Sequence, residues 1–251
     1  MNQKRASLIA VILLVALAVP FAALSFKNKP AAAASFRVET KKAPSGNTYT
    51  IFHQDKLKLD VSLTRPDKGD KNILLCIPGA YTDLVSLKVD GLFIDNGTVY
   101  NKNKVNHTLG GAIKIINGEC EIFPTRKGKL LNDSLINLLV STRGSLFQQI
   151  QLIEKGAGAK YKDVKEFQRR AIVKLKSKSG GISTAVIESF EHITLTDFTK
   201  DLLELGVVDA LYTDMGSWDE GWYRKDNEVE TIGRIRSQTD KQCNWVVFKI
   251  R

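Results

Sequence analysis

The sequence lacks the short motifs that mark several large classes of enzyme. It contains no G-x-S-x-G elbow, no Walker loop, no H-E-x-x-H and no dinucleotide-binding fingerprint. Its three histidines, His53, His107 and His192, are not spaced to share a metal, and nothing places a nucleophile beside any of them. These absences argue against nucleotide, zinc-peptidase, nicotinamide and serine-hydrolase chemistry. We expect no cofactor, and the sequence leaves the metal requirement unknown.

Cysteine is also scarce. Cys76, Cys120 and Cys243 are widely spaced and odd in number, and no C-x-x-C pair is present, so a structural zinc site has no support. Cys76 and Cys120 lie in apolar or alternating stretches, which is typical of buried structural thiols. One disulfide with a free thiol remains open.

Charge of one sign is in excess, with 37 Lys and Arg against 27 Asp and Glu, a formal net charge of +10. The lysines are scattered through expected turns such as 68–71, 102–104 and 174–178, the usual solvated positions. No nucleic-acid module or interleaved aromatic pattern accompanies them. With 43% hydrophobic and 25% charged residues the composition is that of a globular protein, and we expect no nucleic-acid partner.

The first segment predicts export. Lys4 and Arg5 precede an uncharged run from Ala6 to Phe26, in which Pro20 is followed by the small residues of Ala23-Leu24-Ser25. This is the pattern of a cleaved signal peptide, so we expect a periplasmic or secreted protein. The alternative is an uncleaved N-terminal segment that anchors the chain, because the run is long enough to cross a bilayer.

We therefore expect three parts: a signal peptide over residues 1–25, a spacer with N-terminal strands over 26–71, and one domain over 72–251. No integral membrane partner is predicted, and the oligomeric state stays unknown.

Strand patterns dominate the exported part. The apolar run Ile73–Ile77 predicts a buried central strand. Asn117-Gly118 lies between two alternating segments, 111–116 and 119–123, which predicts a tight hairpin. A second hairpin is expected from 170–176 into 183–187.

Two helices are expected among these strands. Thr194 and Asp197 form a capping box before an apolar face that Gly206 ends, and a second helix is expected over Asn132–Val140. Strands with few helices and no regular βαβ alternation predict an α+β fold: a single domain on a mixed, mostly antiparallel β-sheet with a few flanking helices.

One segment combines a carboxylate, glycine and aromatic residues. The expected strand Val207–Tyr212 leads into Asp214, where Gly216 lets the backbone turn close to a ligand. In what we expect to be a glycine-broken loop, further polar and aromatic side chains follow: Ser217, Trp218, Asp219, Trp222 and Arg224. Aromatic faces beside carboxylates suit a sugar site, and packing of the tryptophans under a surface loop is the competing interpretation.

Several segments together resemble a known family in their order. Phe167-Gln168-Arg169-Arg170-Ala171-Ile172 is similar to the "R-T-A-I-G" strand of the phosphodiester glycosidases, and Ala210–Ser217 to their "A-L-x-x-D-G-G-x-S" motif. Upstream, Cys76–Tyr81 resembles "N-A-G-F-F" and Asp90–Ile94 resembles "G-x-x-I", while 144–156 resembles "F-Q-S-G-P-x-L-V-x-x-G". The resemblance covers roughly residues 72–250.

This resemblance implies a hydrolase that cleaves the bond between a sugar anomeric carbon and a phosphodiester. Its substrate would be a carbohydrate or phosphoglycan, with Asp214 and Arg169 as catalytic residues: Asp214 for water or the oxocarbenium charge, Arg169 for the departing phosphate. The implied substrate-binding residues are Gln148, Asp90, Gly79, Tyr81, His107, Gly216, Ser217, Trp218, Asp219, Trp222 and Arg224. Because Pro78 and Met215 depart from the family motifs, the alternative is a non-catalytic envelope glycan-binding protein on the same fold.

Overall fold

The structure is a computed structural model that describes residues 36–177 and 180–251, which belong to one compact unit. The predicted signal peptide lies outside the described residues. No helix in the described part is long and apolar enough to cross a membrane.

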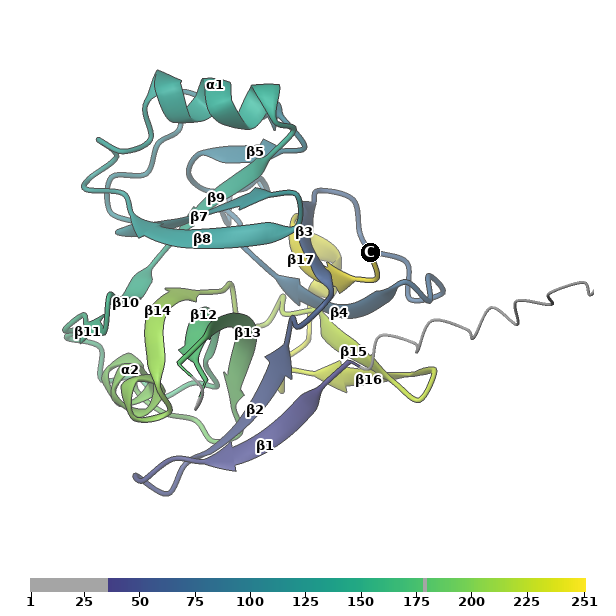
Figure 1. The fold of residues 1–251 in the computed structure, drawn as a ribbon, viewed down its shortest axis with the longest axis vertical. Coiled ribbons are helices and arrows are strands. Elements are labelled where there is room, and N and C mark those ends of the chain that lie inside the picture. Colours follow the sequence, from purple (N-terminus) through teal and green to yellow (C-terminus); the bar gives the residue numbers. More distant parts are fainter. Residues whose placement is uncertain (1–35, 178–179) are drawn as a thin grey trace, which may run out of the picture. The chain divides into compact units, whose positions relative to one another are not determined.

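Three β-sheets make up most of the described chain (Figure 1). The largest has seven strands in the order β1 (Val38–Lys42), β2 (Thr48–His53), β13 (Ile182–Ser189), β12 (Arg170–Lys176), β14 (Val207–Tyr212), β10 (Gln151–Glu154) and β11 (Ala157–Gly158). The second has the order β16 (Glu228–Ile232), β15 (Gly221–Lys225), β4 (Ile73–Pro78), β17 (Trp245–Lys249) and β3 (Lys58–Ser62). The third has the order β6 (Thr98–Val99), β5 (Phe93–Asp95), β9 (Ser145–Gln149), β7 (Gly111–Ile116) and β8 (Glu119–Pro124).

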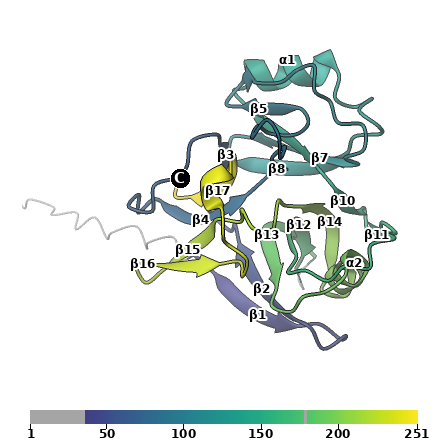
Figure 2. The ribbon, with the colours of Figure 1, turned by 180° about the vertical axis from the view of Figure 1, so that it is seen from behind.

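Helices contribute little to this framework. In Figures 1 and 2, α1 (Asp133–Ser141) lies on the third sheet and α2 (Leu195–Glu204) lies against β14 and β10 of the first. A short 3-10 turn covers Thr239–Lys241. The described part is therefore a β-rich single domain, more dominated by sheet than the predicted α+β class suggests.

The expected mixed sheet is wrong in one respect, because every strand pairing in the described residues is antiparallel. Hairpins and longer antiparallel returns link the strands, so no parallel crossover is needed. The hydrophobic pattern of a sequence predicts individual strands but not which strands pair, so the division into three sheets was not predicted.

The predicted local elements are confirmed. Strand β4 is buried along its whole length, and Asn117 and Gly118 have positive φ (55° and 82°) in the β7–β8 hairpin. Strands β12 and β13 form the second hairpin. Asn132 caps α1, and the Thr194 side chain accepts a hydrogen bond from the Asp197 N–H at the start of α2.

One core joins the three sheets. Phe52 of β2, Leu75 of β4 and Phe147 of β9 are buried in the same cluster as Leu211 of β14 and Phe248 of β17. Strands β2 and β3, which precede residue 72, pair with β13 and β17. The N-terminal strands thus belong to the same fold as the part of the chain after them.

A candidate active site after strand β14

The end of β14 meets the end of β4, although the two are far apart in the sequence. The Asp214 N–H donates to the carbonyl oxygen of Gly79 at 2.9 Å. The Thr82 N–H in turn donates to Asp214 Oδ2 at 3.2 Å. These two backbone contacts fix the Asp214 carboxylate at the junction of the first and second sheets.

Burial sets the protonation of Asp214. Removal of the carboxylate from water raises its pKa from 3.8 to about 7, and the negative charge of Asp219 acts in the same direction. The Thr82 N–H opposes the shift, but the burial effect is larger. Asp214 therefore titrates near neutral pH, where one carboxyl group can both donate and accept a proton.

Two cavities open beside this carboxylate. One, of about 320 Å³, is lined by Asp214 itself together with Thr82, Gly216, Ser217 and Trp218. The other, of about 280 Å³, is lined by Tyr81, Phe167, Arg169, Tyr212 and Arg234. Both share the wall formed by Met215, Gly216 and Asp219. We call them the Asp214 cavity and the Arg169 cavity.

The Arg169 guanidinium, which lines its cavity, already makes hydrogen bonds to other residues of the chain. Its Nη2 donates to Asp163 Oδ2 at 2.7 Å and to the Lys165 carbonyl oxygen at 2.8 Å, and Nη1 donates to the Tyr212 hydroxyl at 3.3 Å. The residue is 5% exposed. Arg169 is therefore a buried side chain with fixed partners and not a solvated surface arginine.

Arg170 is buried more deeply and has a different task. Its two Nη atoms donate to the two carboxylate oxygens of Asp219, each at 2.9 Å, and its Nε donates to Glu188 Oε2 at 2.6 Å. Burial of this bidentate pair leaves no space beside it: a Cβ on Gly233 would lie 2.1 Å from Asp219 Oδ2. Arg170 therefore holds the far end of the 214–219 turn in place.

Several predicted site residues do lie together here. Gly79 and Tyr81 follow β4, and the Tyr81 ring meets the Tyr212 ring edge to face at 6.3 Å. Gly216 has φ of 149°, a conformation that L side chains rarely adopt. The Trp218 indole Nε1 donates to Gln238 Oε1 at 3.1 Å, which fixes the ring in the wall of the Asp214 cavity.

Three predicted substrate-binding residues lie elsewhere and line neither cavity. Gln148 is buried, its Oε1 accepting from the N–H groups of Leu92 and Asn106. Asp90 accepts a hydrogen bond from the Asn106 amide at 2.9 Å. His107 is exposed, and its Nδ1 is 2.9 Å from the Lys127 carbonyl oxygen.

Trp222 and Arg224 are also outside the two cavities, because the second half of the expected glycine-broken loop belongs to strand β15. Trp222 packs in a core cluster with Cys76, and the Arg224 guanidinium donates to backbone carbonyl oxygens, Lys68 among them. The turn Asp226-Asn227, with φ of 48° and 70°, closes the β15–β16 hairpin. That dipeptide was the sequence signal for the strand.

Sequence reasoning missed Arg234 and Thr82. Arg234 lies over the Phe190 ring at 4.4 Å, lines the Arg169 cavity and makes no ion pair with any described residue. Nothing in its sequence neighbourhood distinguishes it from other surface arginines. Thr82 acts through its backbone N–H, a contact that side-chain type does not predict.

The described residues contain neither a disulfide nor a cluster of potential metal ligands. All three cysteines are free, with Cys76 and Cys120 buried. Within residues 36–177 and 180–251, no group of three or more His, Cys, Asp or Glu side chains is arranged to hold a metal ion.

Comparison with solved structures finds the same fold elsewhere. The catalytic domain of zebrafish N-acetylglucosamine-1-phosphodiester alpha-N-acetylglucosaminidase, auto-inhibited by its pro-peptide, is similar with a TM-score of 0.58 and 12% identity, over 86% of this chain and 83% of that one. The chain shares the fold of that catalytic domain. A hypothetical protein from Synechocystis is similar with a TM-score of 0.54 and 10% identity, over 86% of this chain and 62% of that one.

No family model matches the sequence, and no curated protein matches it either. The relationship is therefore visible in the structure and not in sequence comparison. At 12% and 10% identity, these two similarities concern the fold.

Proposed function

We propose that this protein is an exported hydrolase that cleaves the bond between a sugar anomeric carbon and a phosphodiester, in a glycan or glycopolymer. The observation that carries the proposal is Asp214, a carboxyl group with a pKa near 7 in the wall of a cavity at the meeting of two sheets. The shared fold with a phosphodiester glycosidase catalytic domain supports it.

The two cavities suit the two halves of such a substrate. Trp218 offers an aromatic face in the Asp214 cavity, on which the apolar C–H face of a sugar ring can pack. The Arg169 cavity carries two guanidinium groups, from Arg169 and Arg234, to face an anionic phosphate. The anomeric carbon would then lie at the shared wall, beside Asp214.

Asp214 would act on the water or the leaving oxygen. Phosphate is a good leaving group, so little protonation is needed at the departing oxygen, and the carboxylate form can take a proton from the attacking water. Near pH 7 both forms of Asp214 are populated. Arg170 does not contact the substrate in this scheme, and it keeps the turn that follows Asp214 in place through Asp219.

The proposal is tested with the chain lacking residues 1–25 and a panel of sugar-1-phosphodiesters. Release of the free sugar should be lost in Asp214→Asn and kept in Asp240→Asn, a matched change at an exposed carboxylate of the nearby 3-10 turn. Equal activity of the two variants, or no hydrolysis of any panel member by the unchanged chain, contradicts the proposal.

The pairing of Asp219 with Arg170 supports a second candidate function. Glycosidases commonly use two carboxylates, but Asp219, the other carboxylate lining these cavities, is fully engaged by Arg170. This favours a non-catalytic glycan-binding protein on the same fold. In that case the panel members bind without turnover, and Asp214→Asn changes the affinity only slightly.

A further inference from the structure

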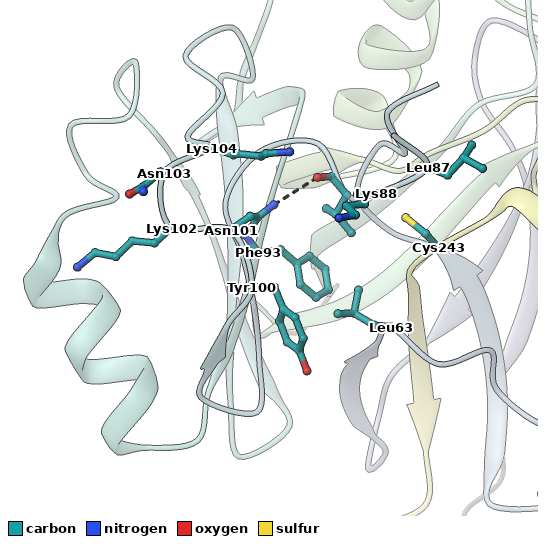
Figure 3. A pocket seen from close by; sticks show the side chains of 11 residues that line it. Leu63, Leu87, Lys88, Phe93, Tyr100, Asn101, Lys102, Asn103, Lys104 and Cys243 are labelled. Carbon is teal, nitrogen blue, oxygen red and sulfur yellow. Dashed lines mark hydrogen bonds between the residues drawn. The ribbon is translucent and has the colours of Figure 1, made fainter. Parts of the chain in front are cut away.

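A third cavity shares no lining residue with the Asp214 and Arg169 cavities. It has a volume of about 620 Å³, within the usual range for small-molecule sites. Its apolar side chains come from distant segments: Leu63 after β3, Leu87 and Val89 from the loop after β4, Phe93 at the start of β5, and Tyr100 after β6 (Figure 3).

The walls of this cavity are fixed by hydrogen bonds. The Asn101 side chain accepts from the Phe93 N–H at 2.6 Å and donates to the carbonyl oxygens of Val89 and Gly91. Across the opening, the loop is closed by the Asp83 N–H donating to the Lys88 carbonyl oxygen at 2.8 Å. These internal hydrogen bonds hold the walls of the cavity in place, which lowers the cost of ordering them around a ligand.

Positive charge lies at its rim. Figure 3 shows Lys88 and Lys104 on the same side of the cavity as Asn101, whereas Lys102 extends away from it, toward α1. Lys102 pairs with Asp133 of α1 at 3.0 Å. Among the described residues, no carboxylate lies within ion-pair distance of Lys88 or Lys104.

Asp83, in the loop after β4, interacts electrostatically with Lys104. Hydrogen bonds from the N–H groups of Ser86 and Val85 satisfy it and hold its pKa below the usual range, with a smaller contribution from Lys104. The rim therefore keeps a surplus of positive charge above an apolar interior.

We propose that this cavity binds one anionic amphiphile, a molecule with an apolar body and a single acidic head group. The body would fill the space between Leu63, Phe93 and Tyr100, and the head group would lie between Lys88 and Lys104. The proposal does not depend on the function proposed for the Asp214 cavity.

Cys243 provides a reporter in the cavity wall. Its thiol is half-buried and lines the cavity, whereas Cys76 and Cys120 are buried. Its Sγ lies 3.3 Å from the hydroxyl of Thr82. Alkylation of the folded chain by N-ethylmaleimide, followed by mass spectrometry, therefore measures access to the cavity, and Cys243→Ser is the blank.

Monomeric decyl phosphate is the probe. At saturation it should slow alkylation of Cys243 by about tenfold or more, because the reagent then reaches only the small unoccupied fraction. Removal of both charges in Lys88→Gln/Lys104→Gln should raise the half-protecting concentration by about tenfold or more, and Lys102→Gln should leave it unchanged. Equilibrium dialysis should give one decyl phosphate per chain, whatever the reactivity of the thiol.

Three controls separate the parts of the proposal. Inorganic phosphate tests the head group alone, decyl glucoside tests the chain without charge, and anionic vesicles test a membrane surface. We expect each of the three to protect Cys243 from alkylation less well than decyl phosphate does at the same concentration. The proposal is overturned if any of them protects the thiol equally well, if decyl phosphate does not bind in dialysis, or if the double lysine variant binds decyl phosphate as well as the unchanged chain.

Discussion

Replacement of Arg170 by Met tests how the 214–219 turn is held. Arg170 is fully buried and joins two carboxylates, Asp219 through two hydrogen bonds and Glu188 through a third. Loss of the guanidinium would leave both carboxylates buried and unpaired. Breaking a buried pair in this way costs about 3–5 kcal/mol, so we expect the free energy of unfolding to fall by that amount.

Arg169→Met is the matched comparison from the next position in the chain. Arg169 has one acidic partner, Asp163, whose side chain is 31% exposed and can return to water. We therefore expect a loss of only about 1–2 kcal/mol for this variant.

The assay is urea unfolding of the two variants and the unchanged chain. The triple change Arg170→Met/Glu188→Gln/Asp219→Asn removes the charges together and should recover part of the loss, because no unpaired charge remains buried. A cost below about 1 kcal/mol for Arg170→Met, or no recovery in the triple variant, would refute the reasoning.

Three further predictions follow from the same contacts. Burial raises the pKa of Asp214 from 3.8 to about 7, so ionisation of this carboxyl group opposes folding. As the pH rises from about 4 to 7, the free energy of unfolding of the unchanged chain should therefore fall by up to about 4 kcal/mol, and Asp214→Asn should not show this loss. Thermal unfolding of both across that range checks this, and a difference independent of pH would contradict it. Gly233→Ala should destabilise the chain by about 1–3 kcal/mol in the same assay, since the new Cβ meets Asp219, whereas Gly46→Ala, which also has positive φ but open space, should cost less. Thr194→Ala should cost about 1 kcal/mol of stability through loss of the α2 cap, and no loss in chemical denaturation would exclude the capping contact.

Local chemistry accounts for the parts of the fold that the sequence predicted. The Asn117-Gly118 hairpin and the Thr194 cap depend on residues within a few positions of one another, so they can be predicted without knowledge of distant contacts. The apolar run of β4 predicted its burial for the same reason.

The arrangement of the site depends instead on contacts between distant segments. Nothing near Arg170 in the sequence indicates that Asp219 pairs with it, and the resemblance to the "R-T-A-I-G" motif favoured Arg169. Trp222 and Arg224 have the residue types of a sugar site, yet β15 directs them into the core and toward backbone carbonyl oxygens. Residue type suggested the chemistry, and strand pairing decided which side chains reach a cavity.

Hydrolysis in water enriched in oxygen-18 tests the proposed reaction most directly. The unchanged chain, lacking residues 1–25, is incubated with a sugar-1-phosphodiester, and both products are analysed by mass spectrometry. Cleavage at the anomeric carbon places the label in the sugar hydroxyl, and this is the result that we predict for attack by water beside Asp214. Label in the phosphate product, or no turnover of any sugar-1-phosphodiester in the panel, would contradict a phosphodiester glycosidase.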